Sequence, residues 1–473
     1  MDVLLVYPPI SSQERYSSAI GSSGGRQVPL GIFALAAWLR RHGHTVAAVD
    51  GEAAGLTADR IAEIVQTRRP GLVGISSTTV AFHRAVEVAA AIKRDPGSPP
   101  VVLGGPHVTA NPDSLLAGLA FDWGIVGEGE ISLLALVEAL AAGADTTTLP
   151  GLARRSGDRV VVNPRAPLIE NLDELPLPAY DLIGDIKAYT PPPSNYRSLP
   201  VMNVVTSRGC PNRCTFCDRA VFGNRFRPMG AARIAEEIGY LRETFGVKEI
   251  AFVDDTFTVD KRRVYDLFAL LRERGLRVDW TCMSHVNTVD DELLAFMSAQ
   301  GCWHISFGIE SGNEQILRLI RKNITRERVA HVIGRCAALG IRTKGFFMIG
   351  HPGETAATIE ETIAFGLQLP LDDIVVTLNT PIPGSGQYAS ANEFGSLERD
   401  DWSRFNMWRP VFVPHGLSAD LMLRKQREFY RRFYLRPRVI LRYAAGFAAP
   451  GGLRRLRAIA GALPYLFRRG RPV

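Results

Sequence analysis

The feature that most constrains the fold is an alternation of short apolar runs with helical stretches, which occurs twice along the chain. In the first part, the apolar runs lie at 3–7, 45–49, 72–76, 101–103 and 123–126. The helical stretches between them include 30–40, 58–66 and 84–94. Short buried strands alternating with helices predict a parallel sheet covered on both faces. Residues 1–140 are therefore expected to form a doubly wound, Rossmann-like α/β domain, with its ligand crevice at the carboxyl ends of the strands.

A second alternation begins near residue 202. Its candidate strands lie at 202–206, 249–253, 278–283, 304–309, 343–349 and 374–378. Its candidate helices include 231–245, 261–274, 291–299, 326–339 and 355–369. Six such strand–helix units predict a partial, TIM-like (β/α)6 barrel, in which chemistry gathers at the C-terminal ends of the strands.

The 473 residues therefore divide into four expected segments. The domain 1–140 is followed by a proline-rich linker, 141–200, with a hairpin at 152–162. The barrel is expected over 201–385, and 386–473 provide a capping segment and a basic helical tail. Residues 380–423 are expected to cap the barrel opening, where four aromatic residues either line a substrate pocket or pack the cap: Tyr388, Trp402, Phe405 and Trp408.

The formal net charge of +7 is concentrated in the tail. Residues 424–473 hold 14 Arg and Lys but a single acid, Glu428, which leaves a net charge of −6 on the rest. The tail reads as amphipathic helices that either contact an anionic membrane surface peripherally or pack on the body with solvated arginines. No recognised nucleic-acid-binding motif accompanies the charge, so nucleic acid is not an expected partner.

The N-terminus predicts a cytoplasmic protein. Met1 leads straight into an apolar strand without a basic segment, so we expect no signal peptide. No apolar run approaches the length of about 18 residues that a membrane span needs. Cysteine is sparse, with six residues, as is typical of a reducing compartment.

Three of those cysteines, Cys210, Cys214 and Cys217, form a CxxxCxxC run directly after the first barrel strand, with Phe216 before the last. Three thiols within eight residues cannot form a paired disulfide framework, but they suit a loop around one metal centre. A zinc site needs a fourth Cys or His nearby, and none follows within fifty residues. A 4Fe-4S cluster held by three thiolates keeps one iron open for a substrate or cofactor.

This CxxxCx(aromatic)C motif resembles the signature of the radical S-adenosylmethionine (SAM) superfamily, whose usual fold is the partial barrel. The resemblance implies that the open iron binds the amino and carboxylate groups of SAM. It also implies that an electron from the cluster cleaves SAM to methionine and a 5′-deoxyadenosyl radical, which abstracts hydrogen from a substrate. An electron donor such as flavodoxin or ferredoxin is then an expected partner.

The resemblance also implies a set of SAM-binding residues at the strand ends. Asp254, Asp255 and Thr256 occupy the place of residues that hold the amino group. Hydroxyl and imidazole groups after the third strand are expected near the ribose: Ser284, His285 and Asn287. The remaining expected contacts are Glu310 and Ser311 for ribose or amino group, Arg321 and Lys344 for the carboxylate, and Gly350 in the adenine-binding stretch.

The first domain resembles the cobalamin (vitamin B12)-binding domain that precedes the radical SAM domain in many enzymes. The expected contacts are Glu52, Ser76, Ser77, Thr78, Gly104, Gly105, Gly127, Glu128 and Gly129. Related domains carry DxHxxG with a cobalt-binding histidine, but Glu52 occupies that position here, and a carboxylate is a poor substitute. Cobalamin is therefore expected to bind without a histidine lower ligand. The alternative is a doubly wound domain without cobalamin, and His107, His42 and His44 are expected to be ordinary loop and surface histidines.

The leading interpretation is a cobalamin-binding radical SAM enzyme acting on a small biosynthetic substrate: a natural product, sugar or lipid. It either methylates an unactivated carbon or carries out a radical oxidation or ring rearrangement. One alternative is a cobalamin-independent dehydratase of a diol-bearing aminosugar, and another is a non-catalytic sensor. The other thiols, Cys282, Cys302 and Cys336, are expected in the core, although Cys282 ends a strand and keeps a secondary claim to chemistry.

Overall fold

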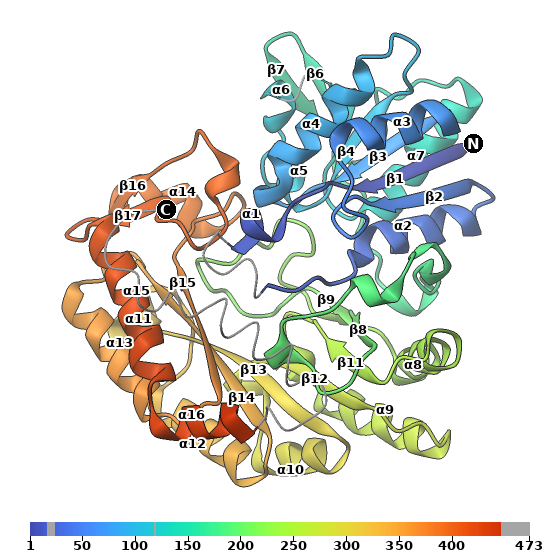
Figure 1. The fold of residues 1–473 in the computed structure, drawn as a ribbon. Coiled ribbons are helices and arrows are strands. Elements are labelled where there is room, and N and C mark those ends of the chain that lie inside the picture. Colours follow the sequence, from blue (N-terminus) through green and yellow to red (C-terminus); the bar gives the residue numbers. More distant parts are fainter. Residues whose placement is uncertain (17–23, 118–119, 446–473) are drawn as a thin grey trace.

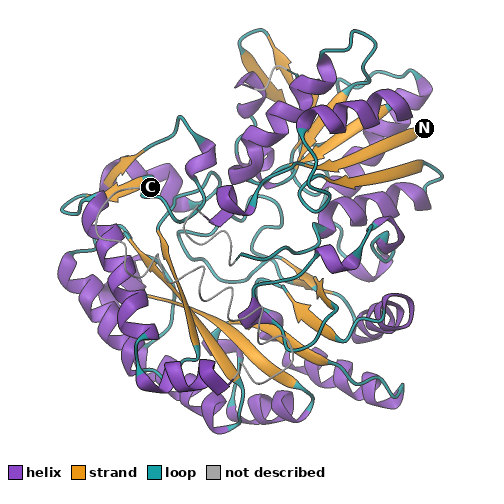
Figure 2. Cartoon of the chain, viewed as in Figure 1, coloured by secondary structure: helices purple, strands orange, loops and turns teal. Residues whose placement is uncertain are grey.

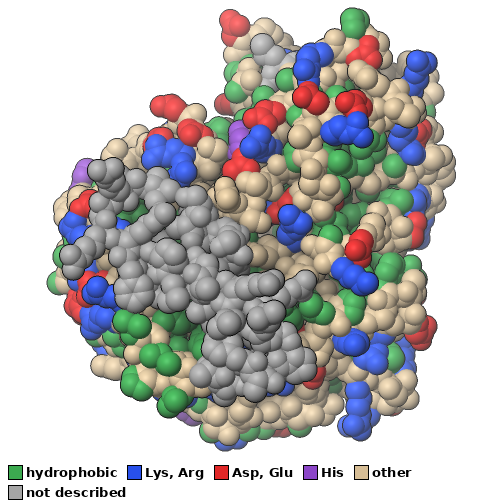
Figure 3. Space-filling view, viewed as in Figure 1, with side chains coloured by type: hydrophobic (Ala, Val, Ile, Leu, Met, Phe, Trp, Pro, Cys, Tyr) green, Lys and Arg blue, Asp and Glu red, His purple; other side chains and the backbone are tan. Residues whose placement is uncertain are grey.

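The computed structural model describes residues 1–16, 24–117 and 120–445. Two parallel sheets lie beside each other, each with helices outside it (Figures 1 and 2). No helix in this described part of the chain has the length and apolar character needed to cross a membrane. Acidic and basic side chains are interspersed over the face drawn in Figure 3.

The N-terminal sheet has the predicted doubly wound arrangement. Its parallel strands are β1 (Asp2–Tyr7), β2 (Thr45–Asp50), β3 (Leu72–Ser76), β4 (Val101–Gly104) and β5 (Trp123–Ile125). Its helices are α1 (Ser12–Tyr16), α2 (Leu30–Arg41), α3 (Ala58–Arg68), α4 (Phe82–Lys93), α5 (Pro106–Ala110), α6 (Ser114–Ala117) and α7 (Gly129–Ala142). The strand order β2-β1-β3-β4-β5 reverses beside β1, which is where doubly wound folds open a ligand crevice.

The predicted hairpin is present, as β6 (Leu152–Ser156) and β7 (Arg159–Val162). β6 pairs antiparallel with β5, so the hairpin extends the N-terminal sheet. The chain then crosses to the second sheet through a stretch with little regular structure over 163–200.

The second sheet is a six-stranded parallel half-barrel, as predicted (Figure 1). Its strands, in spatial order, are β8 (Val201–Val204), β11 (Glu249–Phe252), β12 (Asp279–Ser284), β13 (Cys302–Glu310), β14 (Arg342–Ile349) and β15 (Asp373–Leu378). The helices outside it are α8 (Ala231–Phe245), α9 (Lys261–Glu273), α10 (Asp291–Ala299), α11 (Glu314–Leu319), α12 (Arg326–Ala338) and α13 (Ala356–Gln368). Side chains from Asp260, Asp290, Asn313, Thr325 and Thr355 cap five of these helices.

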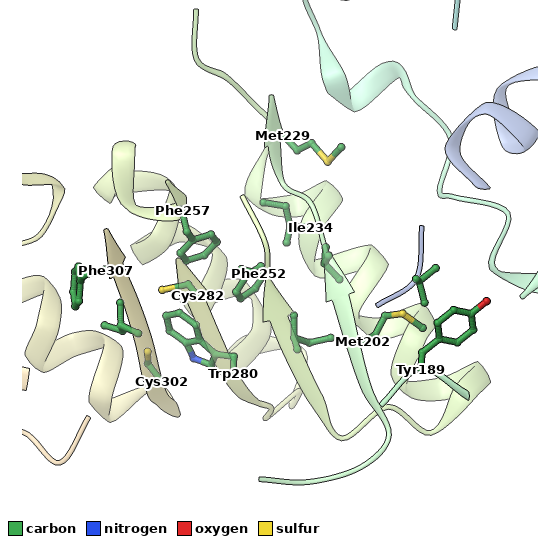
Figure 4. Packing of buried hydrophobic residues seen from close by; sticks show 14 of the residues in the cluster. Tyr189, Met202, Met229, Ile234, Phe252, Phe257, Trp280, Cys282, Cys302 and Phe307 are labelled. Atoms are coloured by element: carbon green, nitrogen blue, oxygen red, sulfur yellow. The ribbon is translucent and has the colours of Figure 1, made fainter. Parts of the chain in front are cut away.

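Apolar side chains fill the space between the half-barrel and its helices (Figure 4). Trp280 is fully buried there, stacked on Phe268 with ring centroids 4.6 Å apart. Cys282, Cys302 and Cys336 are buried in the same cluster, as predicted for core thiols.

The segment after β15 contains α14 (Gly386–Phe394), β16 (Gly395–Leu397) and β17 (Phe412–Pro414). Its aromatic residues pack: the Trp402 ring lies 5.2 Å from His107 and 4.9 Å from Phe405. Asn406 donates from Nδ2 to the carbonyl of Glu14 at 3.0 Å. This segment therefore joins the barrel to the N-terminal domain.

The first tail helix, α15 (Ala419–Tyr434), packs on α13 and β15, with Met422, Phe429 and Phe433 fully buried. Of the two alternatives predicted for the tail, this helix follows the one in which it packs on the body of the protein. The next helix, α16 (Pro437–Ala445), exposes Ile440 and Leu441. Residues 446–473 lie outside the described part of the chain, so membrane contact stays a prediction.

We predict that Phe433→Ala destabilises the protein by about 3–5 kcal/mol, because it opens a cavity beneath α15. The matched variant Leu435→Ala removes an apolar side chain that is 48% exposed and should cost under about 1 kcal/mol. Urea unfolding followed by circular dichroism measures both. Equal losses of stability would contradict the packing of α15.

Candidate active site between the two domains

The three cysteines lie on a loop after β8, residues 209–226, which we call the cysteine loop. It connects the two strands of a short ribbon, in which β9 (Ser207–Arg208) pairs antiparallel with β10 (Arg227–Pro228). Asp254, which is 1% exposed, accepts hydrogen bonds from the amide (2.9 Å) and hydroxyl (3.0 Å) of Thr206. It also accepts one from the hydroxyl of Ser207. The carboxylate predicted to hold the amino group of SAM therefore anchors the start of the cysteine loop.

The three thiols lie on this loop and form no disulfide. Cys210 Sγ lies 3.9 Å from Thr256 Oγ1 and accepts a hydrogen bond from Asn212 Nδ2 at 3.5 Å. A hydrogen bond with Cys217 lowers the pKa of the buried Cys214 to about 7. The same hydrogen bond raises the pKa of Cys217, so the two thiols share a proton and Cys214 is the one that ionises first.

Within residues 1–16, 24–117 and 120–445, no three Cys, His, Asp or Glu side chains converge as the ligands of a single metal ion do. An iron–sulfur cluster makes a different demand, because each thiolate binds a different iron and the sulfurs lie apart. Three free thiols on one loop, without a fourth ligand, fit a cluster with an open iron.

Lys322 and Glu310 form a buried ion pair near the thiols, with Nζ and Oε1 3.1 Å apart. Lys322 Nζ also lies 5.8 Å from the centre of the Phe216 ring. Burial lowers the pKa of Lys322, but attraction to Glu310 and Cys214 outweighs it, and the pKa ends above its ordinary value. A Cβ at Gly308 would lie 2.6 Å from Nζ, so the glycine leaves room for the pair. Lys322 was not predicted from the sequence. The one feature that could have indicated it as a site residue is that it follows the fourth barrel strand.

The turn after β14 surrounds Phe216 with buried polar groups. Glu354 accepts from the amides of Gly350 (2.6 Å) and His351 (3.1 Å). The His351 ring lies 5.8 Å from Phe216, is fully buried, and has no hydrogen-bond partner at either nitrogen. Burial lowers the pKa of His351 to about 3, so the ring is neutral. Unpartnered Glu354 Oε1 and Asn379 Oδ1 lie in the same turn region, and such atoms fit the binding of a polar ligand.

The side chains predicted to contact the ribose form hydrogen bonds mainly with one another and with the protein backbone. Ser284 shares a hydrogen bond of 2.5 Å with Thr258. His285 Nδ1 accepts from the amide of Asn287 at 3.2 Å, and the Asn287 side chain donates to the carbonyl of Asn323 at 2.6 Å. His285 Nε2 lies 3.4 Å from the carbonyl of Lys322, which connects this turn to the ion pair.

The remaining predicted SAM residues are dispersed. Ser311 bonds Thr362 of α13 at 3.0 Å, whereas Asp255 and Arg321 are exposed. Lys344 lies five residues before the end of β14 and pairs with Asp373 at 2.9 Å and Ser194 at 3.1 Å. The structure does not bring Lys344 to the cysteine loop, because its ammonium group is engaged near the start of the strand.

A cavity of about 440 Å³ lies at the carboxyl ends of the N-terminal strands. Seven of the nine residues predicted to bind cobalamin line it: Ser76, Thr78, Gly104, Gly105, Gly127, Glu128 and Gly129. The ribbon and cysteine loop contribute Arg208, Val221 and Phe222 to the opposite wall. The cavity is therefore bounded by both domains.

The other two predicted residues lie behind the cavity wall. Glu52 forms an ion pair with Arg15, which also donates to the hydroxyl of Tyr7 at 3.1 Å. Ser77 is fully buried, and its hydroxyl donates to the carbonyl of Thr78 at 2.8 Å. Because the Glu52 carboxylate is bound to Arg15, it does not take the place of a cobalt-binding histidine.

The cavity wall offers a ligand both bare backbone and a polar group. A Cβ at Gly104 would meet no atom within 4 Å, so the strand end presents bare backbone to open space. Arg208 Nη1 lies 3.3 Å from Glu128 and makes no hydrogen bond. A corrin ring with amide side chains can approach such backbone closely and accept a hydrogen bond from such a group.

Two family models match the chain. The radical SAM superfamily model covers residues 204–366, and the B12-binding domain model covers residues 16–137. These ranges contain the cysteine loop and most of the cavity wall.

Curated relatives match over most of the chain. An uncharacterized methyltransferase of Pyrococcus horikoshii is 36% identical over 93% of this chain and 94% of the relative. The cytidylyl-2-hydroxyethylphosphonate methyltransferase of Streptomyces wedmorensis is 30% identical over 70% of this chain and 71% of the relative. The anaerobic magnesium-protoporphyrin IX monomethyl ester cyclase of Rubrivivax gelatinosus is 28% identical over 92% and 78%, respectively.

Two solved structures share the fold. The radical SAM methyltransferase TsrM of Kitasatospora setae, with cobalamin and a [4Fe-4S] cluster bound, has a TM-score of 0.67 at 20% identity, covering 91% of this chain and 81% of that one. The cobalamin-dependent radical SAM enzyme OxsB has a TM-score of 0.73 at 17% identity, covering 98% and 72%. Together with the family models and the 36% identical relative, they show that the chain belongs to the radical SAM superfamily, in the group whose members carry a cobalamin-binding domain.

Proposed function

We propose that this radical SAM enzyme uses cobalamin to methylate an unactivated carbon of a small biosynthetic molecule: a natural product, a sugar or a lipid. The observation that carries the proposal is the shared wall between the two sites. Arg208, Val221 and Phe222 face the cavity, and the same stretch of chain bears the three cysteines. When bound, the cluster and SAM supply a radical that abstracts hydrogen, and cobalamin supplies the methyl group.

In this proposal, the residues of the chain hold and orient the cofactors. Cys210, Cys214 and Cys217 hold the cluster through their thiolates. The groups around Phe216, namely Lys322, His351 and the Gly350 turn, bind SAM through its carboxylate and adenine. The buried Lys322 ammonium suits the carboxylate better than the exposed Arg321 or the distant Lys344 does. The glycine-rich strand ends hold cobalamin, and no histidine ligates its cobalt.

The methyltransferase relatives support C-methylation, whereas the cyclase relative favours a radical ring closure as a second candidate. The cobalamin-independent dehydratase has less support, because the cavity is open and lined by glycines. Anaerobic reconstitution with iron, sulfide and hydroxocobalamin, followed by metal analysis, separates the two cobalamin-dependent reactions from the cobalamin-independent dehydratase. We expect about four irons and about one cobalt per chain, and four irons without cobalt would favour the dehydratase.

We also propose that an acidic electron-transfer protein, such as flavodoxin or ferredoxin, delivers the electron at the cysteine loop. Cys217 and Arg213 are exposed on this loop. Exposed arginines favour encounter with an acidic partner, and the effect weakens as ionic strength rises.

We predict that Cys214→Ala abolishes both the cluster and SAM cleavage, because two thiolates do not retain the four irons. The control is Cys336→Ala, which removes a thiol buried in the core rather than one on the loop. Iron content and 5′-deoxyadenosine formation are measured after reconstitution. SAM cleavage by Cys214→Ala, or loss of iron from Cys336→Ala, would overturn the assignment of the cysteines.

We predict that Gly104→Leu prevents cobalamin retention but still incorporates about four irons when no chelator is present, because the new side chain enters the cavity without a backbone clash. The matched control is Gly184→Leu, at an exposed linker glycine where a Cβ also meets no atom within 4 Å. Cobalt and iron per chain are determined after desalting. Full cobalt in Gly104→Leu would place cobalamin elsewhere.

A further inference from the structure

Four ionised side chains are buried together between the two domains. Glu128 and Glu130 belong to the turn that begins α7, and Arg208 and Arg227 belong to the β9–β10 ribbon. We call these four residues the interdomain ion cluster. Their side chains are between 2% and 11% exposed.

The charges of the interdomain ion cluster are paired. Arg227 donates to both oxygens of Glu128, at 2.6 and 3.2 Å. Arg208 Nη2 donates to Glu130 at 2.5 Å, and its Nη1 lies 3.3 Å from Glu128 without forming a hydrogen bond. Glu128 also accepts from the amide of Ile169 at 2.9 Å. Removing one member would leave a buried charge uncompensated, so the four side chains hold one arrangement.

This cluster touches both proposed cofactor sites. Glu128, Glu130 and Arg208 line the cavity. Arg208 is also two residues before Cys210. Gly209 lies between them in a crowded place, with φ +81° and with the carbonyl oxygen of Arg225 only 2.2 Å from where a Cβ would lie. A ligand that changes the position of Arg208 therefore acts next to the first cysteine.

One nitrogen of this arrangement makes no hydrogen bond within the protein. Arg208 Nη1, which lies 3.3 Å from Glu128 in the ion pair, is buried at the cavity wall, and a carbonyl oxygen of a ligand in the cavity can accept a hydrogen bond from it. A ligand that does so also fixes the orientation of the guanidinium toward Glu128 and Glu130.

We propose that Arg208 is a positioning residue shared by the two cofactor sites, and that through it cobalamin binding and cluster retention strengthen each other. The inference rests on one part of the proposed function, namely that the chain binds both the cluster and cobalamin. Coupling between two sites is reciprocal, so each cofactor must affect the other by the same factor. A purely structural clamp would hold the domains together but leave the two affinities independent.

The test measures binding rather than turnover. We expect hydroxocobalamin, titrated anaerobically and followed by absorbance, to bind cluster-loaded wild-type protein about tenfold more tightly than cluster-free protein, which is within the usual range for coupled sites. In the converse measurement, we expect hydroxocobalamin to slow the removal of iron by an iron chelator.

In Arg208→Gln and Glu130→Gln, we expect the affinity ratio to fall to about one and the protection of iron to disappear. We use two variants because one of them could fail to fold for reasons unrelated to coupling. Circular dichroism checks that each variant is folded. The control is Arg225→Gln, which breaks an exposed ion pair with Glu170 near the same loop and should keep the wild-type ratio.

An affinity ratio near one in wild-type protein, or a wild-type ratio in folded Arg208→Gln, would overturn the inference. Failure of the proposed function is recognised separately. A protein that binds both cofactors cooperatively but methylates no substrate would refute methylation alone. A protein that binds no cobalamin would refute both.

Discussion

The pairing of two buried carboxylates with two guanidinium groups is the interaction on which the relation of the two sheets depends. The half-barrel sheet and the first five strands of the N-terminal sheet are parallel, and both place polar loops at their carboxyl ends. When two such faces meet, they remove charged groups from water, which is costly unless each charge finds a partner. Glu128 and Glu130 come from one face, and Arg208 and Arg227 come from the other. Neither domain can balance these charges alone, so the contact specifies a particular orientation.

Smaller contacts also hold the N-terminal domain against the barrel. The amide and carbonyl of Val28 both bond the Asn203 side chain of β8, at 3.0 Å each. Trp402 brings the segment after the barrel against His107 of α5. His107 was expected in a loop but lies in α5, where it is fully buried, with Nδ1 3.2 Å from the hydroxyl of Thr79 and no hydrogen-bond partner at Nε2. The cavity is therefore enclosed by contacts distant in sequence, and its shape belongs to the assembled chain.

The sequence predicted the strands well, because strands buried on both faces read as apolar runs bounded by polar loops. It could not show that the hairpin joins the N-terminal sheet, since pairing of β6 with β5 leaves no local pattern. The predicted residues at or just after a strand end, such as Gly104 and Gly127, line the cavity. Lys344 precedes the end of β14 by five residues and lies away from the cysteine loop. Lys322 was missed because it lies twelve residues after β13, beyond α11, and sequence spacing does not reveal that the fold returns it to Glu310.

The last strand of the half-barrel has an open edge, and the tail helix α15 covers it. The amide of Val376 donates to the hydroxyl of Tyr430 at 2.8 Å, and its carbonyl accepts from Gln426 at 2.8 Å. These side chains occupy backbone groups that another strand would otherwise bind. The half-barrel thus remains open at β15 without offering a template for self-association, and a shortened chain lacking α15 would expose unpaired backbone groups at this edge to other chains.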